Sequence, residues 1–324
     1  MPVVTYLAAI GAAQKEAMEE DDRVILMGED VRSNLYGTAP NFVELFGADR
    51  VINTPISEAS VAGMGVGAAM TGLRPIVDLT YASFMYLAFD QLINQAAKSR
   101  YMSGGQAKIP VVYRASMFYG SSTAAHHSDR PYPMLMNVPG LKILAPACPH
   151  DAKGLLRTAV RTDDPVVIFE DATLWMQKEE LPDIEFFVPF GEARIVCEGT
   201  DVTIVAIAGS VRHALSAVAQ LAEEGVSTEL IDPRCLVPLD RDAILNSVGK
   251  TGRLVVVDPA NRTCSAASEI SAIVVEEAFS CLRAGICRVT TPDVHIPFSP
   301  PMEKPLYPTK DKIVAAVREV LTPL

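Results

Sequence analysis

The sequence predicts an α/β protein with a parallel-sheet domain followed by a smaller α/β domain. Short apolar runs alternate with helical stretches along the whole chain, a pattern typical of parallel strands that are buried on both faces. A stretch rich in proline, acidic and aromatic residues interrupts this alternation at 181–189. The 324 residues are also enough for about two domains of ~150 residues each. We therefore predict a first domain over 1–185 and a second over 186–324.

The first domain is expected to open with an amphipathic helix over 1–20. This segment has no basic start and no clean apolar block, so it does not read as a signal peptide. Apolar runs then predict the strands, and helical spacing of apolar residues predicts the helices. The expected strands are 24–27, 74–80, 110–114 and 165–169, and the expected helices are 82–101 and 150–162.

The second domain repeats the alternation. We expect its first helix to be capped by Ser210. Residues 291–308 contain six prolines, so we expect a surface segment there and no sheet strand. The expected strands are 201–208, 227–232, 253–258 and 286–291, and the expected helices are 210–224, 240–249, 266–281 and 309–321.

The bulk composition argues against several classes of partner. The net charge of −11 and the pI near 5.0 disfavour nucleic acid or an anionic membrane as the main partner. No segment approaches the roughly 20 consecutive apolar residues that span a bilayer. The six cysteines are scattered without metal-ligand spacing, so we expect reduced thiols in a cytoplasmic protein.

Two acidic residues are candidates for chemistry. Glu58 follows a Thr-Pro turn and precedes a run of small apolar residues; it is either a functional acid or a first-turn acid that complements the helix dipole after a Ser57 cap. Glu29 follows the first predicted strand, at the end where parallel sheets carry ligands. Alternatively, Glu29 is a solvent-exposed acidic residue of a loop.

Two further candidates lie after strands. His127 belongs to the HHSD sequence of a long loop. A histidine there can exchange protons near neutral pH, or it can be a loop residue without a catalytic role. Phe84 either stacks on a flat ring or belongs to the core. No GxSxG elbow supports a Ser-His-Asp hydrolase.

Phosphate-binding motifs are weak or missing. Residues 63–68 fit GxGxxA, but no strand directly precedes them, so close packing is favoured over dinucleotide binding. The sequence has no GxxxxGK[ST] loop and no GDG motif followed by Asn at the spacing that holds a magnesium diphosphate.

Taken together, these segments resemble one family. GEDV, TPISEASVAGMGVGAAMTGLRPIVD and FDQLINQAAKSRYMSGG in the first half, with GTDVTIVAIAG, ELIDPRCLVPLD and SVGKTGRLVVVD in the second, are similar to the β subunit of the thiamine-diphosphate-dependent component of 2-oxo acid dehydrogenases. The resemblance implies a transketolase-like pyrimidine-binding domain followed by a transketolase C-terminal domain. It also implies an α2β2 heterotetramer whose α subunit holds magnesium and the diphosphate.

The resemblance implies roles for the candidate residues. Glu58 matches the acid that hydrogen-bonds N1′ of the cofactor's aminopyrimidine and prepares the thiazolium carbon for attack. Glu29 matches an acid near it, on a proton route between two sites. Phe84 matches the aromatic that packs on the pyrimidine, and the backbone of Ile56 matches the contact to the ring's amino group.

On the substrate side, His127 matches the family histidine that assists the reaction or acyl transfer to lipoamide. The family shows HSQ where this chain has HSDRP, so Asp129 and Arg130 are expected to bring new charges there. Some members bind potassium through backbone oxygens. The matching positions are Val111, Ala159, Val160, Thr162 and Asp164.

The leading hypothesis is therefore a β subunit that acts with an α subunit, decarboxylates a small 2-oxo acid and passes the acyl group to a lipoyl acyltransferase component or carrier protein. One alternative is a two-component, transketolase-like ketol or acyl transferase with a sugar or carrier-protein acceptor. A second is a non-catalytic assembly subunit that keeps the fold.

Overall fold

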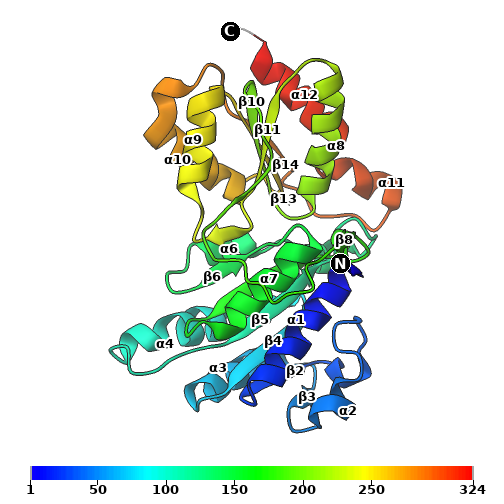
Figure 1. Cartoon of the computed structure of the whole chain (residues 1–324), viewed down its shortest axis with the longest axis vertical. Coiled ribbons are helices and arrows are strands. Elements are labelled where there is room, and N and C mark those ends of the chain that lie inside the picture. Colours follow the sequence, from blue (N-terminus) through cyan, green and yellow to red (C-terminus); the bar gives the residue numbers. More distant parts are fainter. Residues whose placement is uncertain (1, 323–324) are drawn as a thin grey trace. The chain divides into compact units, whose positions relative to one another are not determined.

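The computed structural model describes residues 2–322, which divide by their contacts into two compact units (Figure 1). The first unit comprises Met1–Phe118 and Met134–Phe190, and the second comprises Tyr119–Pro133 and Gly191–Leu324. The segment that carries His127 thus belongs to the second unit, although both its ends continue into the first. The single boundary between residues 185 and 186 stays a prediction.

The first unit is built on a parallel sheet. Its strands lie in the order β6-β7-β5-β4-β2-β3, and each neighbouring pair is parallel. The apolar runs form these strands because both faces are covered by helices. The strands are β2 (Val24–Gly28), β3 (Val51–Asn53), β4 (Arg74–Tyr81), β5 (Val112–Met117), β6 (Lys142–Leu144) and β7 (Val166–Asp171), and β1 (Val3–Thr5) pairs separately with β8 (Lys178–Glu180).

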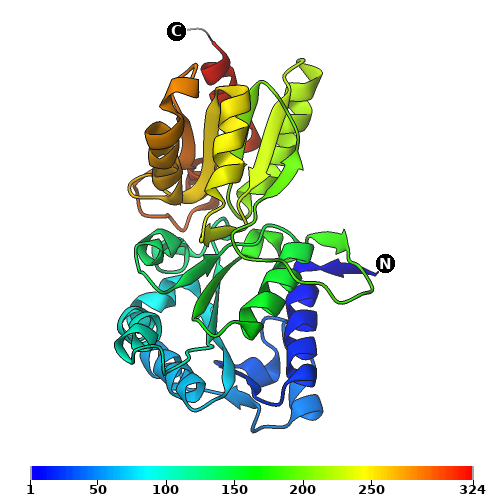
Figure 2. The same cartoon turned by 60° about the vertical axis from the view of Figure 1, so that its left-hand side comes forward.

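Helices cover this sheet on both sides. In Figure 2, α1 and α7 lie on one side and α3 and α4 on the other. A Cβ on Gly65 of α3 would come within 2.7 Å of Val77 on β4, so the small residues permit close packing of the helix on the sheet. The helices are α1 (Tyr6–Glu20), α2 (Phe42–Phe46), α3 (Glu58–Met70), α4 (Ala97–Met102), α6 (Tyr132–Met136) and α7 (Pro149–Arg161).

The helix predicted over 82–101 is not one continuous α-helix. Ala82–Ala88 forms a 3₁₀ helix, Gln91–Ala96 a π-helix and Ala97–Met102 the α-helix α4. Met85, Ala88, Leu92 and Ala96 are all buried. Their spacing of three, four and four residues fits an α-helix, so this pattern does not reveal the 3₁₀ and π turns.

The second unit contains a smaller sheet in the order β14-β13-β10-β11-β9. Its pairs are parallel except β9, which is antiparallel to β11 and was not predicted. In Figure 1, α8 and α12 lie on one face, and α9 and α10 on the other. The strands are β9 (Arg194–Cys197), β10 (Val202–Ala206), β11 (Thr228–Asp232), β13 (Leu254–Asn261) and β14 (Cys287–Thr291), with β12 (Cys235–Val237) as a further short strand.

The helices of the second unit differ from expectation in two details. The predicted cap by Ser210 is wrong, because Gly209 occupies the cap position and Ser210 is the first helical residue. The proline-rich segment contains a short helix, α11, and buries Glu303 and Tyr307. The helices are α5 (Ala124–His127), α8 (Ser210–Glu223), α9 (Arg241–Thr251), α10 (Ala266–Ala278), α11 (Pro300–Glu303) and α12 (Lys310–Leu321). Within residues 2–322, every helix is too short or too polar to cross a membrane.

Candidate active site

Glu58 lies where a short strand turns into a helix. β3 ends at Asn53, Pro55 lies in the following turn, and Glu58 is the first residue of α3. Ser57 occupies the cap position, but its hydroxyl bonds Ser60 Oγ (3.0 Å) instead of a backbone amide. The half-buried Glu58 carboxyl therefore lies at the positive end of the helix dipole.

Glu29 and Asp78 lie at the same edge of the sheet. Glu29 directly follows β2, which pairs with β4 so that Gly28 is opposite Asp78. A Cβ at Gly28 would lie 2.6 Å from the carbonyl oxygen of Asp78, so only glycine permits this approach. Partial burial, followed by the charges of Asp30 and Glu58, raises the pKa of Glu29.

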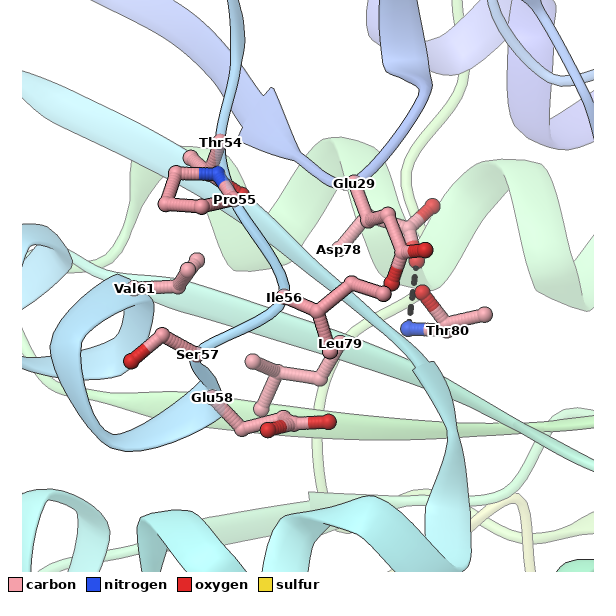
Figure 3. Close-up of a pocket in the computed structure, with 10 residues that line it drawn as sticks. All are labelled: Glu29, Thr54, Pro55, Ile56, Ser57, Glu58, Val61, Asp78, Leu79 and Thr80. Carbon is pink, nitrogen blue, oxygen red and sulfur yellow. Dashed lines mark hydrogen bonds between the residues drawn. The ribbon is translucent and has the colours of Figure 1, made fainter.

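These residues line an open pocket at the edge of the sheet (Figure 3). In Figure 3 the side chain of Ile56 lies between the carboxyl groups of Glu29 and Glu58. Ile56 is 73% exposed, whereas the hydroxyl oxygen of Thr54 is buried without a hydrogen-bond partner in the described chain. The lining residues are Glu29, Thr54, Pro55, Ile56, Ser57, Glu58, Val61, Asp78, Leu79 and Thr80.

The backbone is strained at one edge of this pocket. Thr80 has a φ of 64°, which is unusual for a β-branched residue. Its amide donates to Asp78 Oδ1 at 2.9 Å, at the point where the register between β4 and β5 shifts. Such strain persists only where the surroundings enforce it, and it concentrates at functional sites.

A buried charged network lies behind the pocket. The guanidinium of Arg114 donates from Nε and Nη2 to Glu170 (2.6 and 3.0 Å) and from Nη1 to Gln14 (2.8 Å) and Asp78 (3.3 Å). Arg114 and Glu170 are each 2% exposed. The network thus connects the core to Asp78 in the pocket wall. This network was not predicted from the sequence, although charged residues within apolar strands were the signal.

Phe84 belongs to an aromatic cluster. Its ring lies 5.1 Å from Tyr81, whose ring lies 4.2 Å from Phe118. Phe118 also contacts Trp175 (4.9 Å), and Tyr36 contacts both Phe118 and Trp175. Burial, followed by nearby acidic groups including Tyr81 and Asp78, raises the pKa of Tyr36 to about 12. Phe84 is half-buried and does not line the pocket of Figure 3.

His127 ends the short helix α5 in the second unit. Its Nδ1 lies 3.2 Å from the carbonyl oxygen of Thr123. A carbonyl can only accept, so in the neutral imidazole this contact places the proton on Nδ1 and the lone pair on Nε2. The hydroxyl of Ser128 donates to the carbonyl of Ala124 (2.7 Å) and contacts Thr123 Oγ1 (2.9 Å).

Arg130 does not present a new charge to solvent. It is 5% exposed, and its guanidinium lies over the rings of Tyr119 (5.3 Å) and Tyr307 (5.4 Å). Its Nε donates to the carbonyl of Pro259 at 2.8 Å. The guanidinium is thus built into the second unit, and the expectation that Arg130 brings a new charge near the substrate side stays a prediction.

The positions matched to a potassium site already carry other interactions. Arg74 donates to the carbonyl oxygens of Val160 (2.7 Å) and Thr162 (2.6 Å). The carbonyls of Val111 and Ala159 accept from Val166 (3.0 Å) and Thr162 (3.3 Å). The Asp164 carboxylate pairs with Arg100 and with Lys142 (2.8 Å). A potassium site here stays a prediction.

The structure thus brings together three predicted residues, Glu29, Ile56 and Glu58, in one pocket. Phe84 lies in the aromatic cluster of the same unit, and His127 lies in the other unit. Polar residues of the pocket that were not predicted as site residues are Thr54, Asp78 and Thr80, and the apolar residues Val61 and Leu79 were not predicted either. Their signals were weak, since each is a common residue type.

Comparison with known families gives matches over both units. Residues 3–176 match the family model "Transketolase, pyrimidine binding domain", and residues 191–313 match "Transketolase, C-terminal domain". A solved structure described as a split gene transketolase, inactive beta4 tetramer, is similar in fold, with a TM-score of 0.83 over 99% of both chains. Its sequence identity is 23%, so this likeness concerns the fold alone.

Several curated relatives are similar over nearly their full length. The β subunit of the Bacillus subtilis acetoin:2,6-dichlorophenolindophenol oxidoreductase is 44% identical, over 98% of this chain and 97% of the relative. The β subunit of Rickettsia felis pyruvate dehydrogenase E1 is 41% identical, over 98% of both. The β subunit of B. subtilis 2-oxoisovalerate dehydrogenase is 40% identical, over 99% of both. The chain therefore belongs to the thiamine-diphosphate-dependent, transketolase-like family of 2-oxo acid and acetoin dehydrogenase β subunits.

Proposed function

We propose that this protein is the β subunit of a thiamine-diphosphate-dependent 2-oxo acid dehydrogenase. With an α subunit, as an α2β2 heterotetramer in the cytoplasm, it decarboxylates a 2-oxo acid and transfers the acyl group to a lipoyl carrier. The observation that carries this proposal is the pair Glu58 and Glu29 in a pocket at the carboxyl edge of a parallel sheet, within a chain of this family.

The pocket residues fit the aminopyrimidine of the cofactor. They offer a carboxyl at a helix start, an exposed apolar side chain and backbone at Ile56, and a Thr54 hydroxyl oxygen without a partner in the described chain. When bound, thiamine diphosphate supplies the carbanion-stabilising chemistry. We assign the pyrimidine to Glu58, Glu29, Ile56 and Phe84. The α subunit would hold magnesium and the diphosphate, and potassium would lie at the backbone positions named above.

Glu58 would hold or release a proton at its carboxyl oxygens, next to the ring nitrogen that the family acid serves. Its position at the start of α3 fixes the carboxyl relative to the turn Thr54–Ser57. Glu29 lies close enough that the charge of Glu58 raises the pKa of Glu29. The negative charge of Glu58 disfavours ionisation of Glu29, so Glu29 keeps its proton more readily.

His127 would serve the substrate side. The bond from Nδ1 to Thr123 fixes the ring and leaves the Nε2 lone pair as the acceptor. A neutral imidazole in this tautomer takes a proton at Nε2 and returns it during acyl transfer. This role requires that the loop 119–133 holds the ring in one orientation.

The test uses the protein co-expressed with its α subunit. Glu58→Gln should lower thiamine-dependent decarboxylation of the best 2-oxo acid by about 10²- to 10⁴-fold, since it removes an acid–base group. Glu44→Gln, an exposed acid on α2, is the matched control and should keep full activity. Undiminished turnover of the Glu58 variant would overturn the proposal and favour a non-catalytic assembly subunit.

The similarity to two relatives favours acetoin as a second candidate donor. Two β subunits of acetoin:2,6-dichlorophenolindophenol oxidoreductases, from B. subtilis and Cupriavidus necator, are 44% and 43% identical to this chain. The donor panel should therefore compare acetoin, pyruvate, branched 2-oxo acids and ketose phosphates with an artificial electron acceptor. Preferred turnover of acetoin would assign that donor, and turnover of ketose phosphates alone would favour the transketolase-like alternative.

A further inference from the structure

One buried carboxylate accepts hydrogen bonds from the loop that carries His127. Glu303 of α11 is 1% exposed. Its Oε1 accepts the amide of Gly120 (2.8 Å) and the hydroxyl of Tyr307 (2.8 Å), and its Oε2 accepts the amide of Ser122 (2.8 Å). All four residues belong to the second unit. A carboxylate with three such donors is well satisfied despite its burial.

The backbone that Glu303 binds has an uncommon conformation. Gly120, Ser122 and Ala124 have φ values of 77°, 57° and 59°. Left-handed residues placed in this way turn backbone N–H groups toward one point and create an anion-binding concavity. For Ser122 and Ala124 this conformation is unfavourable in isolation. The anion that compensates for it is supplied by the protein's own Glu303.

The same loop is attached at its other end. The Arg130 guanidinium packs over Tyr119 and Tyr307, whose rings lie 5.0 Å apart. Tyr132 donates its hydroxyl to the buried Asp258. Burial, together with the hydrogen bond to Glu303, raises the pKa of Tyr307, so its phenol remains a donor at neutral pH. Tyr307 therefore contacts both Glu303 and Arg130.

A short path connects Glu303 to the imidazole. Glu303 fixes the amide of Ser122, and the next residue, Thr123, presents the carbonyl that His127 Nδ1 contacts at 3.2 Å. We propose that Glu303 is a positioning residue for His127 in acyl transfer. This inference rests on the proposed function, because it assigns His127 to that step.

The experiment replaces Glu303 by Gln in the assembled enzyme. Gln keeps the shape but turns an NH₂ group toward one of the N–H or O–H donors, so at least one bond is lost. The matched control is Glu276→Gln, an exposed acid on α10. The first readout is hydrogen exchange of the peptide 119–133 by mass spectrometry. We expect at least tenfold faster exchange in the Glu303 variant and no change in the control.

The second readout is a double-mutant cycle. Glu303→Gln should lower the rate of acyl transfer to a lipoyl acceptor by about tenfold or more when His127 is present. In a His127→Ala background it should have little further effect, because residues that act as one unit are not additive. Equal losses in both backgrounds, or unchanged exchange in 119–133, would overturn the positioning role.

Two safeguards keep the test decisive. If Glu303→Gln does not fold, Tyr307→Phe removes one donor only and should give the same effects in smaller size. If the wild-type enzyme shows no acyl transfer with any donor, the proposed function fails. The exchange readout then still decides whether Glu303 orders the histidine loop, so the two failures are distinguishable.

Discussion

The two units support their candidate catalytic side chains in different ways. Glu58 depends on neighbours in sequence, namely the turn after β3 and the first turn of α3. His127 depends on residues more than 120 positions away, such as Pro259 and Glu303. Each unit also contains a buried carboxylate that accepts several hydrogen bonds. Glu170 faces a guanidinium in the first unit, whereas Glu303 faces amides and a phenol in the second.

This difference indicates which replacements the protein tolerates. A buried ion pair that loses one partner leaves a charge without compensation, which costs more than the loss of one neutral donor. The first unit should therefore respond to single charge removals with lost stability. The second should respond mainly with a disordered loop. Four predictions test this contrast, from the largest effect to the smallest.

The largest effect is expected for Glu170→Gln. Arg114 would keep a buried positive charge whose one remaining carboxylate partner is Asp78 at 3.3 Å, beside the neutral Gln14 at 2.8 Å. The free energy of unfolding should therefore fall by about 3–5 kcal/mol. Trp175, the single tryptophan, lies in the first unit and reports its urea unfolding by fluorescence. The double variant Arg114→Met/Glu170→Met should recover part of the loss. If the free energy of unfolding of Glu170→Gln lies within about 1 kcal/mol of wild type, the expected contrast between the two units is contradicted.

A smaller loss is expected for Gly28→Ala. The new methyl group would lie 2.6 Å from the Asp78 carbonyl, so β2 and β4 must separate at the pocket edge. Strain of this kind costs about 1–3 kcal/mol, again measured by Trp175 fluorescence. Gly249→Ala on α9 is the contrast in the second unit. Apart from its own helix, no described residue comes within 4 Å of the new methyl group, so stability should rise by about 0.5–1 kcal/mol.

A still smaller effect is expected for Tyr307→Phe. The variant removes one donor to Glu303 and leaves the two amides, at a cost of about 0.5–1.5 kcal/mol. Because burial raises the pKa of Tyr307, the phenol is protonated throughout the neutral range and the cost should not depend on pH. Hydrogen exchange of residues 119–133 measures this free-energy cost. A cost that depends on pH would contradict the assignment of Tyr307 as a protonated donor to Glu303.

The smallest effect is a pH dependence at Glu29. Its folded pKa is raised above the ordinary 4.5, so between these values the folded state keeps a proton that the unfolded state has lost. Stability therefore falls as pH rises through this window. Glu29→Gln should flatten that slope and raise the melting temperature at neutral pH. The control Glu44→Gln should leave the dependence of stability on pH unchanged. The same slope in Glu29→Gln as in wild type would contradict the assignment of this pH dependence to Glu29.

The fold was largely predictable because its signals are local. Apolar runs predicted β2, β4, β7 and β10 to within a few residues, since a strand buried on both faces must be apolar throughout. The short strands β1, β3, β6, β8 and β12 and the antiparallel β9 were missed. β9 is partly exposed and lacks the continuous apolar run. The π-helix Gln91–Ala96 was missed because its apolar spacing also fits an α-helix.

The site was predictable only where it is local or where a family motif covers it. Glu58 and Glu29 lie beside clear turn and strand signals, and the pocket of Figure 3 contains both. Glu303 had no such signal, because its partners Gly120 and Ser122 are about 180 residues away in sequence. The burial of Arg130 had no local signal for the same reason, since Pro259 and Tyr307 pack against it from distant parts of the sequence.

The insertion of Tyr119–Pro133 into the second unit also bears on biogenesis. A ribosome makes His127 long before Pro259 and Glu303, and domains generally fold as they emerge. The pocket around Glu58 has all its lining residues once Thr80 is made, whereas the imidazole must wait for most of the polypeptide. A chain released early would thus retain the acid but lack an ordered histidine. The order of the loop that carries His127 therefore depends on residues that are translated late.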